Sequence, residues 1–239
     1  MSHLDYYQFQ ARARQVHSVQ DVERLARISA QRYRHILSTW LPADRNSPIA
    51  ELACGHGSFL FWLHDGGYTH VTGIDSSPEQ IDLARQVPGV SVVQADVNTW
   101  LAQQPDASWQ TLFGIDLIEH LSKDDLMVLL SGARRVLRPG GRLILRYPNG
   151  DSPLVGLNLF NDITHVWTYT SNCLTSLSQM HGFARATFVD ESHAAICDHR
   201  WLKVPLCRLS QFILGTLVRA AAKDKVISWS PNLWACLEK

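Results

Sequence analysis

From Pro48 onward the sequence alternates short apolar segments with amphipathic ones, and this alternation constrains the fold more than any other feature. Five short apolar segments are predicted strands, at residues 49–53, 70–74, 90–95, 111–117 and 142–147. Helices are predicted between them, at residues 58–65, 78–86, 99–104 and 123–137. Strands that alternate with helices are typical of a parallel sheet that is covered on both faces. We therefore predict an α/β fold.

Helical segments are predicted on both sides of this region. Apolar positions at helical spacing predict a helix over residues 21–41, so residues 1–45 are interpreted as a helical N-terminal cap. The remaining residues, 46–239, are assigned to the α/β domain. After its fifth strand we expect an irregular loop, and then a helix at 171–181 and strands at 185–190 and 232–237. Residues 192–230 are predicted to form a helical insertion before the last strand.

Composition limits the class of protein. Of 239 residues, 46% are hydrophobic and 18% charged, which suits one α/β domain with a buried core. Lys plus Arg and Asp plus Glu both total 22, and this balance disfavours a nucleic-acid partner, whose backbone attracts a concentrated positive face. The N-terminal residues lack the pattern of a signal peptide, and the five cysteines form no C-x-x-C pair. We expect a cytoplasmic protein with reduced thiols.

Three predicted strands end in residues that suit a nucleoside. The first is followed by Gly55 and Gly57, which let the backbone pass close to a ligand. Leu60 stands where the dinucleotide-binding pattern has its third glycine, which disfavours a pyrophosphate at the helix N-terminus. Asp75 ends the second strand, where a carboxylate can accept hydrogen bonds from ribose hydroxyls, and Asp96 ends the third. Two acids would repel a diphosphate but tolerate an uncharged nucleoside.

Together these motifs resemble those of class I S-adenosylmethionine-dependent methyltransferases. Segments 51–57, 73–75, 95–97, 116–120 and 136–141 occur in that family's order, and the resemblance covers about residues 47–191 and 231–238. It implies a Rossmann-like, seven-stranded, mostly parallel sheet with an antiparallel last strand, and S-adenosylmethionine as cofactor. The implied cofactor-binding residues are Glu51, Ala53, Gly55, Gly57, Asp75, Ser76, Asp96, Val97 and Asp116.

Within that resemblance, Glu51 and the two glycines would surround the methionine part of the cofactor. Asp75 would hold the ribose, and Asp96 with the Val97 amide would contact the adenine. The sequence departs from the family at Ala53, where a glycine is usual.

Candidate catalytic residues follow the fourth strand and lie in the loop after the fifth. Methyl transfer from a sulfonium is an in-line displacement, so the protein mainly positions the acceptor and, for a hydroxyl, removes its proton. His120 and His165 are candidate general bases because imidazole titrates near neutral pH. Asp116, Glu119 or Asp162 could orient such a base. The alternative is structural: Glu119 and His120 cap the following helix, and His165 anchors the loop.

The same residues suggest a second hypothesis, a metal site. Asp116, Glu119, His120 and His165 form an oxygen and nitrogen ligand set that suits Mg²⁺ or Mn²⁺. The pattern resembles that of small-RNA terminal 2′-O-methyltransferases, which carry Glu-x-x-Glu-His and a later His. It also resembles methyltransferases of glycan and natural-product pathways that have no assigned metal.

The insertion offers two interpretations of its own. Apolar and basic residues alternate over 201–225, which suits a helix lying on an anionic membrane surface. A helical cap over the substrate cleft, or a homodimer contact, is the simpler interpretation, since Pro205 interrupts the segment. An apolar insertion at this place resembles methyltransferases of bacterial polysaccharide biosynthesis.

The function predicted from the sequence is O-methylation of a hydroxyl on a sugar, glycan or small metabolite, with a histidine base. The alternatives are metal-assisted 2′-O-methylation of RNA ends and N- or C-methylation of a small molecule. A non-catalytic S-adenosylmethionine-binding protein and an NAD-dependent dehydrogenase are rivals of other classes.

Overall fold

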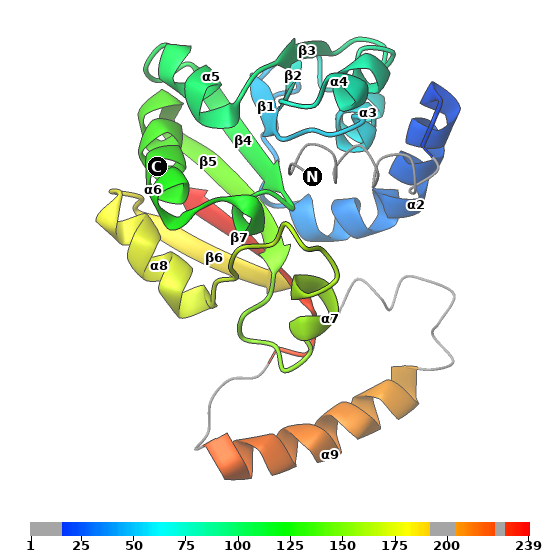
Figure 1. Ribbon diagram of the computed structural model, residues 1–239, viewed down its shortest axis with the longest axis vertical. Coiled ribbons are helices and arrows are strands. Elements are labelled where there is room, and N and C mark those ends of the chain that lie inside the picture. Colours follow the sequence, from blue (N-terminus) through cyan, green and yellow to red (C-terminus); the bar gives the residue numbers. More distant parts are fainter. Residues whose placement is uncertain (1–15, 192–203, 223–227) are drawn as a thin grey trace.

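A seven-stranded mixed sheet forms the centre of the computed structural model, which describes residues 16–191, 204–222 and 228–239 (Figure 1). Its strands are β1 (Ile49–Leu52), β2 (Val71–Asp75), β3 (Ser91–Gln94), β4 (Trp109–Ile115), β5 (Leu137–Pro148), β6 (Arg185–Asp190) and β7 (Asn232–Glu238). They lie in the order β3-β2-β1-β4-β5-β7-β6. The first five strands pair in parallel, whereas β7 is antiparallel to both β5 and β6. The predicted sheet, with its antiparallel last strand, is confirmed.

Helices cover both faces of the sheet. They are α2 (Val19–Leu37), α3 (Ser58–Asp65), α4 (Pro78–Ala84), α5 (Val97–Gln103), η1 (Ile118–His120, a 3-10 turn), α6 (Lys123–Val136), α7 (Gly156–Leu159), α8 (Ser171–Met180) and α9 (Val204–Ala222). Side chains of α2, α3 and α4 share one core cluster with the sheet, and those of α5, α6 and α8 share another. The two clusters are the buried layers expected of a covered parallel sheet.

The N-terminal helix α2 packs into the first of these clusters. Ser18 caps the helix by accepting a hydrogen bond from the Asp21 amide. Tyr33 packs edge-on against Phe59 of α3, with ring centroids 5.0 Å apart, and lies 6.1 Å from Trp234 of β7. The described part of the N-terminal cap therefore shares a core with the sheet. Residues 1–15 lie outside the described residues.

Several element boundaries differ from the prediction for local reasons. Strand β4 ends two residues earlier than expected, because Asp116 adopts a left-handed backbone with φ 52° and η1 follows. Helix α5 begins at Val97, since the Asp96 carboxylate caps it by accepting from the Thr99 amide over 2.9 Å. The short helix α7 was not predicted within the long loop.

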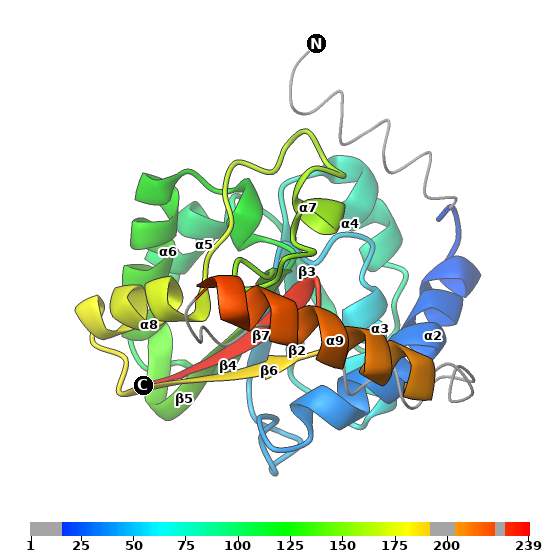
Figure 2. The same cartoon turned by 90° about the horizontal axis from the view of Figure 1, so that it is seen from below.

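Part of the predicted insertion forms the long helix α9. Figure 1 shows this helix beyond the sheet, at one end of the molecule's longest axis, and Figure 2, seen from below, shows it in front of the sheet. Residues 192–203 and 223–227, which flank α9, lie outside the described residues. Among the helices that the structure describes, none combines the length and apolarity that a membrane span requires.

The core position of Trp234 generates a stability prediction. Its side chain is fully buried, and its indole N–H donates to Glu191 over 2.8 Å. We expect Trp234→Ala to lower the free energy of unfolding by about 3–5 kcal/mol, measured by urea denaturation. The matched control is Trp167→Ala, since Trp167 is 49% exposed and meets only the Lys123 ammonium among the ring contacts described, so its loss should cost about 1 kcal/mol or less. Equal losses in the two variants would contradict the packing described here.

Candidate active site

A cavity of about 590 Å³ opens at the carboxyl ends of β1, β2, β3 and β4 and beside the loop after β5. This is the edge where open α/β sheets bind ligands. Every site residue predicted from the sequence lines it except Gly57. Gly57 instead caps α3 with φ 86°, where an added Cβ would come within 3.2 Å of Ala84 and Val87. Its role is to make the turn.

The turn between β1 and α3 has three residues in the left-handed region. These are Ala53, Gly55 and Gly57, with φ values of 59°, 53° and 86°. For Ala53 this conformation costs roughly 1–2 kcal/mol, whereas glycine adopts it freely. The departure at Ala53 is thus accommodated at the cost of some backbone strain.

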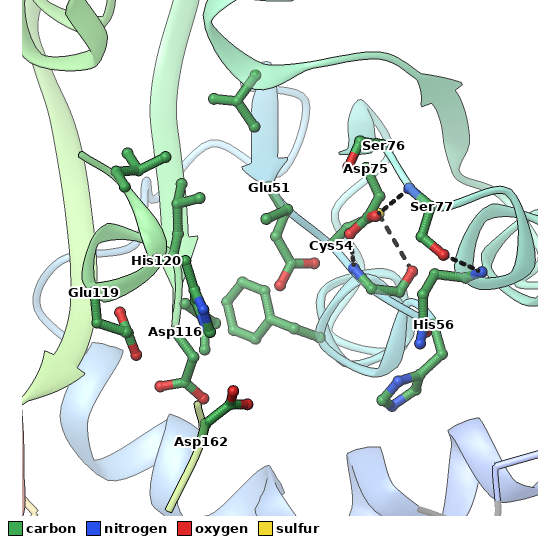
Figure 3. A pocket seen from close by; sticks show the side chains of 18 of the residues that line it. Glu51, Cys54, His56, Asp75, Ser76, Ser77, Asp116, Glu119, His120 and Asp162 are labelled. Carbon is green, nitrogen blue, oxygen red and sulfur yellow. Dashed lines mark hydrogen bonds between the residues drawn. The ribbon is translucent and has the colours of Figure 1, made fainter. Parts of the chain in front are cut away.

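The carboxylate of Asp75 holds this turn. One of its oxygens accepts a hydrogen bond from the Gly55 amide and the other from the Ser77 amide, each over 2.8 Å (Figure 3). Burial raises the pKa of Asp75, and these main-chain hydrogen bonds oppose that rise. Each carboxylate oxygen has a second lone pair, so Asp75 can still accept from ligand hydroxyls.

Glu51 lies at the floor of the cavity, near the end of β1 (Figure 3). Its side chain is buried, and Oε2 has no hydrogen-bond partner among the residues that the structure describes. Burial, and then the neighbouring charges of Asp75 and Asp116, raise the pKa of Glu51 well above its ordinary value. A buried oxygen without a partner is costly, so this position favours a ligand that donates a hydrogen bond or carries positive charge.

The charge of the cavity wall is strongly one-sided. Among its described lining residues there is no Lys or Arg. The acidic lining residues are Glu51, Asp75, Glu79, Asp96, Asp116, Glu119 and Asp162. A wall of this kind attracts a cation and repels a diphosphate, because like charges a few ångströms apart interact by several kcal/mol at the protein surface. The electrostatics therefore disfavour a dinucleotide.

Two imidazoles meet on the opposite side of the cavity from Asp75. The ring centroids of His120 and His165 are 4.6 Å apart, edge to face. Nδ1 of His120 lies 2.9 Å from the hydroxyl of Thr164, and that hydroxyl donates to Asp162 over 2.6 Å. Since the single hydroxyl proton goes to Asp162, His120 must donate through Nδ1, and Nε2 is the unprotonated nitrogen. Sequence analysis named Asp162 but missed Thr164 as the connecting residue.

His165 is oriented in the same way by the main chain. Its Nδ1 lies 3.0 Å from the carbonyl oxygen of Leu159, which can only accept, so Nε2 is again the basic nitrogen. Ligand atoms of Glu119, His120 and His165 all lie within 4.8 Å of one another. Glu119 is buried, and its Oε2 has no partner among the described residues. Two basic nitrogens and a carboxylate at this spacing could hold a divalent ion.

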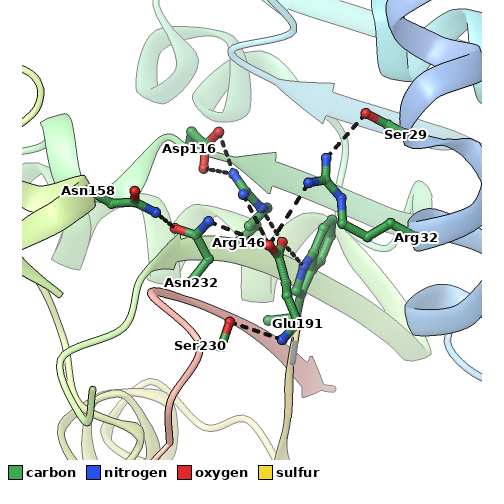
Figure 4. A network of polar contacts seen from close by, with 9 residues as sticks. Ser29, Arg32, Asp116, Arg146, Asn158, Glu191, Ser230 and Asn232 are labelled. Atoms are coloured by element: carbon green, nitrogen blue, oxygen red, sulfur yellow. Dashed lines mark hydrogen bonds and ion pairs between the residues drawn. The ribbon is translucent and has the colours of Figure 1, made fainter. Parts of the chain in front are cut away.

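Asp116 is not a member of this three-residue group. Its carboxylate forms an ion pair with Arg146, at 2.6 Å from the guanidinium for Oδ2 (Figure 4). The guanidinium also donates through Nε to Glu191 over 2.6 Å, and Glu191 accepts from the Trp234 indole. Sequence analysis missed this network. The position of Arg146 within the apolar residues 143–147 of β5 was the feature that could have indicated it, since buried charges are paired.

The fold and the acidic, nucleoside-sized cavity define an α/β protein of the class I S-adenosylmethionine-dependent methyltransferase architecture. Residues 49–141 match the family model described as a methyltransferase domain. The fold is also that of a solved S-adenosylmethionine-dependent methyltransferase from Archaeoglobus fulgidus. That structure aligns with a TM-score of 0.69 at 19% identity, over 90% of this chain and 94% of its own. The chain therefore carries a methyltransferase domain on the class I fold.

Curated relatives match about half of the chain. An uncharacterized transposon protein of Streptomyces fradiae is 33% identical over 130 residues, or 52% of this chain and 36% of that protein. The O-methyltransferase rstn1 of Aspergillus nomiae is 28% identical over 123 residues, or 49% of this chain and 54% of its own. This chain thus covers between about a third and a half of the length of these relatives.

The environment of His120 generates a prediction about its protonation. Burial, and then the proximity of His165, lower the pKa of His120 from 6.5 to about 4, although Asp162 and Asp116 oppose this. We expect its imidazole resonances, in chelator-treated protein, to titrate near pH 4 by NMR. The depressed pKa favours the neutral form in the fold, so the corresponding stability is present above pH 6.5 and is lost as the pH falls toward 4.

An ordinary titration of His120 near pH 6.5 would show that its ring is not buried as described.

Proposed function

We propose that this protein transfers a methyl group from S-adenosylmethionine to a hydroxyl of a sugar, glycan or other small metabolite. The observation that carries the proposal is the acidic cavity, in which the Asp75 carboxylate and the unpartnered Glu51 oxygen lie on either side of a left-handed glycine turn. The fold, the match to a methyltransferase domain and the O-methyltransferase names of several relatives support it.

The cavity residues fit the cofactor. When bound, S-adenosylmethionine supplies an electrophilic methyl group on a positively charged sulfur. Glu51 would accept from its amino group, which would satisfy the buried Oε2. Asp75 and Ser76 would receive the ribose hydroxyls. Asp96 and the Val97 amide would contact the adenine at the start of α5. The surrounding carboxylates would stabilise the cationic donor.

His120 is the proposed general base. The chain Asp162–Thr164–His120 fixes its ring and keeps Nε2 unprotonated, so this nitrogen can take the acceptor proton as the oxygen attacks. A pKa of about 4 keeps His120 neutral at neutral pH and makes it a modest base. His165, whose ring contacts that of His120, would orient the acceptor hydroxyl.

The polarity of the cavity also bears on the acceptor. The neutral polar residues Asn158, Asn161 and Asn232 also line the cavity. Such amides donate and accept hydrogen bonds to hydroxyl groups, which suits a sugar or polyol. The carboxylate-rich wall disfavours a polyanionic RNA end. N- or C-methylation of a small molecule remains the alternative that uses the same donor site.

A metal-assisted reaction is the second candidate, and the cluster of Glu119, His120 and His165 favours it. A divalent ion would satisfy the Glu119 oxygen and both basic nitrogens, and it would lower the pKa of a bound hydroxyl. Thermal melting with and without Mn²⁺ tests the site directly. If a metal binds, Mn²⁺ should raise the melting temperature of the wild type but not of His165→Ala. Unchanged melting of both proteins would remove this candidate.

The cysteines support a reducing compartment for the proposed enzyme. Cys54, Cys173 and Cys236 are free thiols in the described part of the chain, and two of them are buried. We infer a cytoplasmic location from this pattern.

The donor site is tested by calorimetry with S-adenosylhomocysteine. Asp75→Asn removes the charge that is proposed to bind the ribose, so we expect affinity to fall at least about tenfold. The matched control is Asp82→Asn, since Asp82 is an exposed acid on α4 with a 75% exposed side chain. Control affinity should equal that of the wild type. NAD that bound more tightly than S-adenosylhomocysteine would overturn the proposed cofactor.

The base is tested by methyl transfer to a panel of sugars and small hydroxyl compounds. His120→Gln should reduce kcat about 100-fold or more and leave the affinity for S-adenosylhomocysteine unchanged. His181→Gln, which alters a histidine outside the cavity lining, is the control and should keep full activity. A His120→Gln protein with wild-type kcat would show that another group takes the proton, or that none needs to.

A further inference from the structure

Helix α9 exposes an apolar face. Leu209, Phe212, Ile213 and Leu217 are 57%, 67%, 51% and 62% exposed. Phe212 and Ile213 lie three and four residues after Leu209, and Leu217 lies four after Ile213, which places all four on one side of the helix. Gly215, whose position lies on the opposite side of the helix, is buried. In the structure the helix therefore presents its apolar side to solvent, although burial of such a side normally stabilises an amphipathic helix.

A second exposed apolar set lies beside the cavity, in and after α7. Leu157, Phe160 and Ile163 are 66%, 84% and 80% exposed. Their neighbours Asn158 and Asp162 line the cavity. This segment is thus polar toward the cavity and apolar toward solvent. We call it the cavity rim. Figure 1 shows α7 and α9 toward the same end of the molecule.

Charge is also concentrated around α9. Residues 200–225 contain one acid, Asp224, and six basic residues, which gives this segment a net charge of +5. The basic residues are Arg200, Lys203, Arg208, Arg219, Lys223 and Lys225. Because the whole chain is neutral, the remaining residues carry a net charge of −5. The positive charge of the protein therefore gathers at the segment that exposes the apolar helix.

Exposure and charge together indicate what kind of partner would cover the apolar side of α9. A cap over the cleft is not what the structure shows, since no described residue of α9 lines the cavity. A symmetric dimer through α9 would bring the +5 segments of two copies together, and like charges oppose that contact. An anionic lipid surface satisfies both features, because it accepts apolar side chains and attracts Lys and Arg.

We propose that α9 docks on an anionic membrane surface, with the cavity rim against the same surface. The exposed apolar side chains of α9 enter the boundary between headgroups and acyl chains, and the net charge of +5 in residues 200–225 favours an anionic surface. The cavity mouth then opens toward the lipid. This proposal concerns binding alone and stands apart from the methyl transfer proposed above.

Vesicle flotation with the full chain tests the docking. One set of vesicles is phosphatidylcholine alone, and the other is phosphatidylcholine and phosphatidylserine in equal parts. We expect binding to the anionic vesicles at least about tenfold tighter than to the neutral ones, weakening as salt is raised. Equal binding to the two compositions, or binding to neither, would overturn the proposal.

Variants locate the contact. The double variant Phe212→Ser and Leu217→Ser should reduce anionic-vesicle binding about tenfold or more. Phe160→Ser with Ile163→Ser should weaken it by a smaller factor, and an unchanged value would show that the rim faces away from the membrane. The matched control is Ile28→Ser with Val128→Ser, which removes exposed apolar side chains, 68% and 55% exposed, from α2 and α6. Control binding should equal that of the wild type.

Folding and donor binding are checked separately. Each variant should bind S-adenosylhomocysteine as the wild type does, so loss of vesicle binding cannot be attributed to unfolding. If the wild type binds vesicles but no adenosyl ligand, the proposed function fails and the docking stands. If light scattering finds a dimer that the Phe212 and Leu217 variant abolishes, and vesicles do not bind, the face is a self-association surface and the proposal is wrong.

Discussion

The hydrogen bonds from the Gly55 and Ser77 amides to the Asp75 carboxylate join the end of β1 to the end of β2, and the cavity depends on this junction. It adds a side-chain partner to the main-chain hydrogen bond that the Cys54 amide donates to the Ile74 carbonyl of β2 over 2.8 Å. The junction costs the burial of a carboxylate, which the raised pKa of Asp75 reflects. A buried charge held by main-chain amides is already oriented to receive hydroxyl groups of a ligand, so the same interaction organises the fold and defines the site.

A second charged junction lies across the sheet. Arg146 of β5 pairs with Asp116 at the end of β4 and with Glu191 at the end of β6, and Glu191 also contacts the Trp234 indole. These pairs raise the pKa of Arg146 against the effect of burial, so the guanidinium stays charged. The network fixes Asp116 at the cavity wall. It also holds Glu191, the residue that follows β6. The same network therefore stabilises both the cavity wall and the start of the segment that leads to α9.

The alternating pattern predicted the α/β sheet, and the family resemblance implied its antiparallel last strand. Every site residue predicted from the sequence except Gly57 lines the cavity, because residues such as Gly55, Asp75 and Asp96 follow strand ends that can be recognised locally. What the sequence could not supply were partners brought together by tertiary structure. Arg146 with Asp116, 30 residues apart, is one such pair, and Thr164 with His120, 44 residues apart, is another. The exposure of the α9 apolar face also depends on where the helix lies, which periodicity does not reveal.

Asp75 and the acidic cavity wall are proposed to bind an adenosyl donor next to the glycine turn. A crystal structure of the protein with S-adenosylhomocysteine tests this most directly. It should show both ribose hydroxyls within hydrogen-bond distance of the Asp75 carboxylate, with the amino group beside Glu51 and the adenine beside Asp96. A ligand that lies outside this cavity, or that turns its ribose away from Asp75, would contradict the account.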